Sequence, residues 1–275
     1  MTTGGTATGG EPPSGRRRGV RTFDELMDRQ AEAAVALSGA HHSSWRRGRL
    51  GHTRTVERGI VLGTADWDGT LRYHHGDFVA PLQEMFARQG QGIAPQDLVR
   101  YRSALLVVLH ENAHMLAPQG RDNGDERDTP LSPDRKALEE GATEAWAMRN
   151  LDRYIDELGL AEICPGLKRV TEISRYQQYM PAVDVLAERV GEGAGLGRAG
   201  APPAAGRDEV VRRMNCALSD GKWPVLVDLM YESSELRTLA PEHERQVKRR
   251  IDRAMRAPFR ALADLETSAV VTTVP

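Results

Sequence analysis

The string His110-Glu111-Asn112-Ala113-His114 follows the apolar run 105–109 and is the strongest constraint on the fold of this chain. Residues four apart share one face of a helix, so a helix here brings both imidazoles to one metal ion. Glu111 faces the same cavity, where a carboxylate can act as a general base. A zinc site also needs a third protein ligand and an open position for water. The sequence therefore predicts a second element, packed against this helix, that carries the third ligand.

A second motif lies in the segment 138–146, which reads Leu-Glu-Glu-Gly-Ala-Thr-Glu-Ala-Trp. An H-E-x-x-H helix followed by a helix with E-G-x-T-E resembles the gluzincin branch of the zincin metallopeptidases. The resemblance covers about residues 98–190. It implies one zinc ion bound by His110, His114 and Glu140, with Glu111 as the catalytic base.

Several polar residues near these motifs are candidates for supporting roles. Glu144 lies one turn beyond the third ligand and is expected to orient a ligand histidine. Glu139 and Glu144 remain alternative third ligands. Tyr176 or Tyr179 is a candidate hydrogen-bond donor to a developing oxyanion, although a core tyrosine with a satisfied hydroxyl is the alternative. His243 is a further candidate of the same kind.

The remaining patterns predict a mainly helical α+β fold that resembles a zincin domain, with a small N-terminal sheet and a helical C-terminal part. Two strands, 59–63 and 71–73, are expected to form a hairpin around an Asp-Gly turn at 66–69. By resemblance, an edge strand of this sheet lies above the metal helix and pairs with an extended peptide. Amphipathic spacing, capping residues and prolines predict helices at 22–37, 81–88, 95 to about 117, 132–158, 176–190, 210–214, 223–236 and 241–265, the last kinked or broken at Pro258.

Composition restricts the class of protein. The chain has 275 residues, 40% hydrophobic and 28% charged, with a net charge of −2. That balance gives no field for attracting nucleic acid or an anionic membrane, and no apolar run approaches a membrane span. Arg16–Arg18 are not followed by an apolar core, so no export signal is expected. Two cysteines, Cys164 and Cys216, make no disulfide framework and favour reduced thiols in the cytoplasm.

The predicted domain organisation has five parts. Residues 1–19 and 267–275 are expected to be disordered tails. Residues 20–190 form the zincin-like catalytic domain. The glycine-rich segment 191–207 is a flexible linker to a helical C-terminal subdomain at 208–266.

These observations predict a zinc-dependent hydrolase that cleaves peptide bonds in a peptide or protein substrate. One alternative is a zincin fold that has lost activity and serves as a binding or regulatory module. Another is a carboxylate-bridged di-iron protein, because Glu111 and His114 also form an E-x-x-H string. The chain has no second E-x-x-H string for it. The acidic segment 119–128 is a weak candidate for calcium, because its spacing lacks the full EF-hand pattern.

Overall fold

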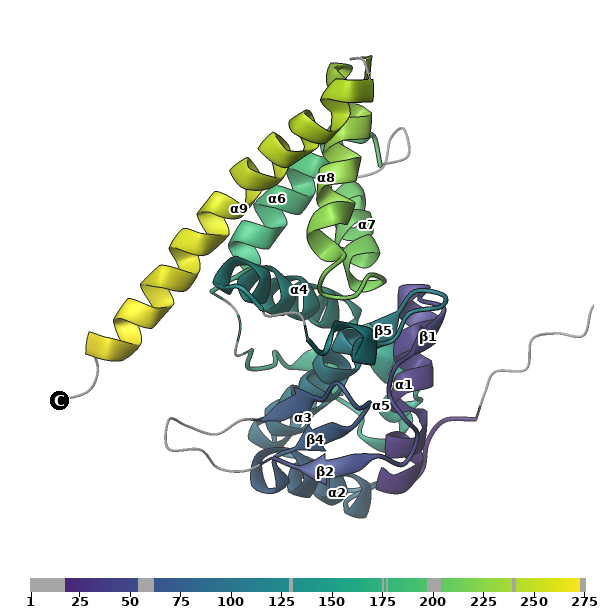
Figure 1. Cartoon of the computed structure of the whole chain (residues 1–275). Coiled ribbons are helices and arrows are strands. Elements are labelled where there is room, and N and C mark those ends of the chain that lie inside the picture. The colour runs from purple at the N-terminus through teal and green to yellow at the C-terminus, as the bar shows by residue number, and fades with distance from the viewer. Residues whose placement is uncertain are drawn as a thin grey trace, which may run out of the picture.

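The computed structural model is mainly helical with a small sheet, which confirms the predominantly helical α+β class (Figure 1). It describes residues 18–53, 62–128, 131–174, 176, 178–196, 204–238 and 241–272. The longer helices are α1 (Phe23–Ser38), α2 (Ala80–Ala87), α3 (Pro95–His114), α4 (Pro133–Glu157), α6 (Met180–Gly193), α7 (Ala204–Asn215), α8 (Lys222–Ser233) and α9 (Pro241–Thr272). A short helix α5 (Leu160–Ile163) follows α4.

The helices α3 and α4 pack against each other and carry the two motifs. The apolar face of α3 is buried in the core together with Leu138, Trp146 and Leu151 of α4. Burial of these side chains supplies most of the stability of the pair, since isolated helices are marginal in water. The two motif-bearing faces therefore have a fixed separation, which is what a shared metal site needs.

The helix α3 ends at His114, three residues before the predicted end near Ala117. Leu116–Ala117 form strand β5, which pairs antiparallel with β1 (His42–Ser43). The backbone of these residues bonds to another strand, so it cannot continue the helix. This two-residue pairing tethers the end of α3 to the N-terminal part of the chain.

A three-stranded sheet lies beside α3, with the order β2-β4-β3 for β2 (Leu50–His52), β4 (Leu71–Tyr73) and β3 (Gly63–Ala65). The predicted hairpin is present as the antiparallel β3–β4 pair. Its turn contains Gly69 at φ 77°, a left-handed conformation that favours glycine. The first strand lies later than predicted, and residues 59–61 fall outside the described part of the chain. β3 is the edge strand nearest α3.

The C-terminal helices pack on the core and on one another: α7 and α9 both contact α4, and α8 contacts α9 (Figure 1). Within the predicted linker 191–207, residues up to Gly193 belong to α6 and those from Ala204 belong to α7. The span 197–203 lies outside the described residues. The expected break at Pro258 is absent, because α9 continues through it as one helix. Phe259, the next residue, packs edge-on against Trp223 at 5.3 Å between ring centroids, which holds the helix in place despite the lost hydrogen bond.

The ends of the chain differ partly from the predicted tails. Residues 18 and 19 are described: Gly19 lies against Gly159, and the Val20 amide donates to the Leu158 carbonyl at 2.9 Å. Residues 1–17 lie outside the described range. At the other end α9 reaches Thr272, beyond the predicted start of the tail at 267. In the described ranges, no helix combines the length and the apolar character that a membrane span requires.

Candidate metal centre

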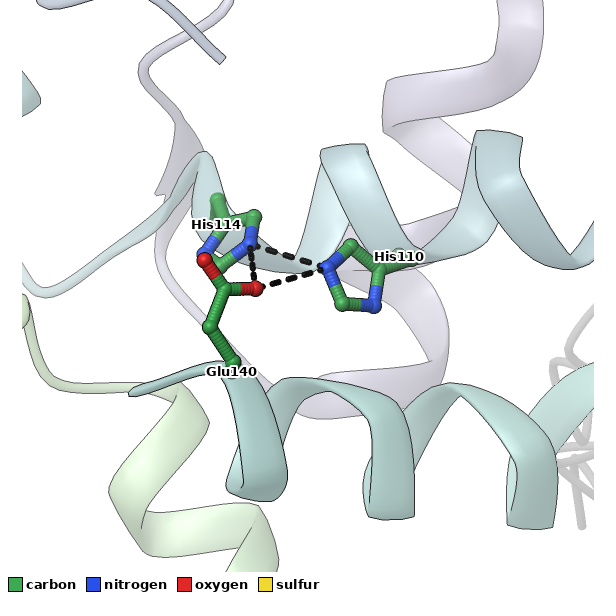
Figure 2. A group of neighbouring side chains, drawn as sticks. All are labelled: His110, His114 and Glu140. Carbon is green, nitrogen blue, oxygen red and sulfur yellow. Dashed lines mark hydrogen bonds and ion pairs between the residues drawn. The ribbon is translucent and has the colours of Figure 1, made fainter. Parts of the chain in front are cut away.

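Two residues of α3 and one of α4 converge on a single point (Figure 2). The His110 Nε2 and His114 Nε2 atoms are 3.1 Å apart. Glu140 Oε2 lies 3.3 Å from His110 Nε2 and 3.5 Å from His114 Nε2. Helical spacing of four residues aligns the imidazoles, as the sequence predicts, and α4 brings the carboxylate across. Their atoms can hold a metal ion together.

The triangle of these three atoms fits a tetrahedral cation. Bonds of about 2.0–2.1 Å from zinc to nitrogen and oxygen place neighbouring ligand atoms about 3.3 Å apart in a tetrahedron. The observed sides of 3.1, 3.3 and 3.5 Å bracket that value. Glu140 Oε2 is also buried and has no hydrogen-bond donor. A buried carboxylate oxygen left in this state is costly, and a cation between the three groups would satisfy it.

A carboxylate contacts the Nδ1 atom of each imidazole and so orients the ring. Glu144 Oε2 lies 2.7 Å from His110 Nδ1, and Glu139 Oε1 lies 2.8 Å from His114 Nδ1. An Nδ1–H that donates to a carboxylate leaves the Nε2 lone pair free for a metal. Glu144 therefore occupies the place predicted for it. Glu139 is an alternative third ligand in the sequence, but its Oε1 atom lies at Nδ1 of His114. Glu140 is the carboxylate that lies beside the Nε2 atoms of both histidines.

The charges of the cluster favour cations. Burial opposes ionisation of Glu140, but the two imidazoles outweigh it and hold the pKa of this carboxyl well below its usual value. Burial likewise disfavours a charged His110, yet Glu140 and Glu144 raise its pKa to about 9. Glu139 and Glu140 raise the pKa of His114 in the same way, against the effect of burial. Without a metal, protons on the imidazoles would thus offset the negative charge of these buried carboxylates.

Glu111 lies in the same cleft but outside the ligand triangle. Burial raises its pKa above the ordinary value, which makes it a stronger base than an exposed glutamate. Its side chain rests against Gly63 of β3, where a Cβ atom would come within 2.6 Å of Glu111 Oε1. Glycine at this position therefore leaves the space that the carboxylate occupies.

The cleft beside the cluster has a volume of about 260 Å³. One wall is the edge strand β3, through Gly63, Thr64 and Ala65. The lining also includes Ala217 and Ser219 from the loop between α7 and α8. An elongated backbone can therefore run along a strand edge past the three converging side chains.

The two candidate tyrosines have different positions. Tyr176 lines the cleft, and its ring stacks on the His110 imidazole at 5.2 Å between centroids. Tyr179 is buried at the start of α6 and is not part of the cleft wall. It lies instead against Gly141, where a Cβ would come within 2.9 Å of the Tyr179 Cβ. The close approach at Gly141 is therefore to α6 and not to the metal helix.

The other predicted candidates lie apart from the cluster. His243 is exposed on α9 and lines no part of the cleft. In the acidic segment 119–128, Asp122 and Asp125 cap a short 3₁₀ helix (Asn123–Glu126). Within the described residues, no second group of metal-binding side chains forms, either for calcium or for a second iron.

Sequence reasoning missed the contribution of the C-terminal helices. Lys222 of α8 is fully buried and lies 3.4 Å from Glu139 Oε2. Buried Glu126 accepts hydrogen bonds from the Ser219 hydroxyl at 2.7 Å and from Arg135 at 3.2 Å, which ties segment 119–128 to the α7–α8 loop. A lysine at the start of an amphipathic helix carries no sequence signal that it is buried.

The chain matches no known protein family, and no curated protein or solved structure is significantly similar to it. The case for a function therefore rests on the chemistry of the cluster.

Proposed function

We propose that this protein is a zinc-dependent hydrolase, a metallopeptidase of the zincin type. One observation carries the proposal: two imidazole nitrogens and a buried carboxylate oxygen that makes no hydrogen bond form a triangle of tetrahedral size. Two histidines and a glutamate with a vacant fourth position are the ligand set of catalytic zinc. A bound zinc ion supplies polarisation of a carbonyl and a lowered pKa for water.

The protein's own groups fit amide hydrolysis. Glu111 takes a proton from the attacking water and returns it to the leaving amine, a role that its raised pKa favours. Its contact with Gly63 limits its movement, so the carboxylate stays beside the cluster. Of the two candidate tyrosines, we propose Tyr176 as the hydrogen-bond donor to the developing oxyanion, because it lines the cleft and its ring stacks on His110.

The substrate we propose is an extended peptide bound along β3. In the strand order β2-β4-β3, no strand of the described residues pairs with the outer edge of β3. The strand β3 also lines the cleft. Such an edge can pair with the backbone of a peptide independently of its side chains. Neither Lys nor Arg is among the lining residues of the described structure, so no ammonium or guanidinium group is available to bind a substrate carboxylate there.

The test compares the wild type with Glu111→Gln on a peptide library read by mass spectrometry. We expect cleavage by the zinc-loaded wild type and a loss of at least about 100-fold in the variant, with zinc content unchanged. Glu162→Gln is the control, because Glu162 is exposed and pairs only with Arg21 in the contacts described. Zinc binding with no cleavage of any peptide would instead support an inactive binding module. Full activity in Glu111→Gln would reject the proposed base.

A further inference from the structure

Lys222 is a buried cation whose charge is directed at the metal cluster. Its side chain is 2% exposed, and burial of an ammonium group is costly unless it is paired. The Nζ atom donates to Asn215 Oδ1 at 3.0 Å and to the Met214 carbonyl at 3.3 Å. Its carboxylate partner is Glu139, at 3.4 Å from Nζ to Oε2. The lysine therefore has two neutral acceptors and one counter-ion.

Glu139 connects this lysine to a metal-binding histidine. One carboxylate oxygen lies 2.8 Å from His114 Nδ1, and the other faces Lys222. The second oxygen is buried and has no hydrogen bond, so the lysine is its nearest source of compensating charge. A buried carboxylate of this kind keeps a fixed direction only while its cation is present.

Asn215, which accepts a hydrogen bond from Lys222, is itself bonded to α4, the helix that carries Glu139. The Asn215 side chain donates from Nδ2 to the Ala142 carbonyl of α4 at 3.0 Å, while its Oδ1 accepts from Lys222. Lysine, asparagine and glutamate thus form a closed arrangement between α4 and the α7–α8 region. His110 has a different support, since the partner of Glu144 on the far side is the neutral hydroxyl of Ser174.

We propose that Lys222 is a positioning residue of the metal centre, which fixes Glu139 so that Glu139 aims the His114 imidazole at the ion. This inference rests on the proposed function, because it needs a cation at the cluster. This role of Lys222 makes the helices α7 and α8 a part of the site, although both are distant in sequence from the two motifs. Metal affinity then depends on a residue that touches no metal.

The experiment measures zinc affinity by competition with a chelator for the wild type and for Lys222→Met, which keeps the length of the side chain. We expect binding 10–100-fold weaker in the variant, the usual effect of losing an outer support of a ligand. Lys248→Met is the matched control and should bind as the wild type does, because Lys248 pairs with Asp228 and Glu244 away from the cleft. Thermal unfolding of the metal-free proteins shows whether each variant folds.

A second pair of variants separates positioning from general damage. In a Glu139→Gln background the neutral amide needs no cation, so adding Lys222→Met should change zinc affinity by less than about three-fold. This comparison also stands if Lys222→Met alone does not fold, because the double variant leaves no unpaired charge. A further ten-fold loss in the double variant overturns the inference, as does wild-type affinity in a folded Lys222→Met protein. A wild type that binds no zinc overturns the proposed function itself.

Discussion

The metal-free imidazoles are predicted to hold protons that a divalent cation must displace. Burial disfavours charged imidazoles, but Glu140 and Glu144 raise the pKa of His110 to about 9, and Glu139 and Glu140 raise that of His114. A metal binds only neutral imidazole. Loading at pH 7.5 should therefore release about one proton from His110 and a further share from His114, whereas two ordinary histidines of pKa about 6.5 would release about 0.2 in total.

This proton release has a measurable size. Each proton released per ion makes the observed affinity rise about 10-fold for each pH unit between about 6 and 8, or about 1.4 kcal/mol. Titration calorimetry with zinc in buffers of different ionisation enthalpy counts the protons directly. Water on the ion adds at most one, so we expect more than one and at most about three protons per ion at pH 7.5. A value of about one or fewer refutes the reasoning, because the histidines would then be neutral before the metal arrives.

Three further predictions follow from the packing and charge of the site. Gly63→Ala places a Cβ 2.6 Å from Glu111 Oε1 and should lower kcat about 100-fold through displacement of the base, with zinc affinity unchanged; a normal kcat contradicts this. Gly141→Ala brings a Cβ within 2.8 Å of Val183 Cγ2. The cost of overpacking, about 1–3 kcal/mol, should outweigh the gain of about 1 kcal/mol in helix propensity. Urea unfolding should therefore show a lower free energy of unfolding for the variant, and a higher one would contradict this. The raised pKa of His110 stabilises the metal-free fold below pH about 6.5, and this contribution is lost as pH rises through about 9. The Tm of chelator-treated protein should fall across that range and that of zinc-loaded protein should fall less; parallel curves would argue against it.

Local patterns in the sequence predicted the longer helices, several of them with shifted ends, and the three residues that form the cluster. Thr22 accepts from the Glu25 amide at 3.1 Å, and Gly159 at φ 69° follows α4, both at predicted boundaries. The spacing of His110 and His114 defines one helix face, and that face is where the structure places the cluster. Periodicity and capping act within a few residues, so a single sequence displays them.

Features that depend on tertiary packing could not be read in this way. The end of α3 depends on a two-residue strand pairing with a distant segment. The continuation of α9 through Pro258 depends on the packing of Phe259 against Trp223. Lys222 looks like an ordinary exposed lysine until α8 is placed on the core. In each case a long-range contact outweighs a local preference, and the sequence alone does not say which residues will meet.

The most direct test of the account is a crystal structure of zinc-loaded protein with anomalous diffraction recorded on both sides of the zinc edge. We expect one peak per chain, about 2.0–2.2 Å from the Nε2 atoms of His110 and His114 and from a carboxylate oxygen of Glu140. Zinc bound elsewhere, or an empty cluster in crystals supplied with zinc, would contradict the claim that these three side chains form a metal centre.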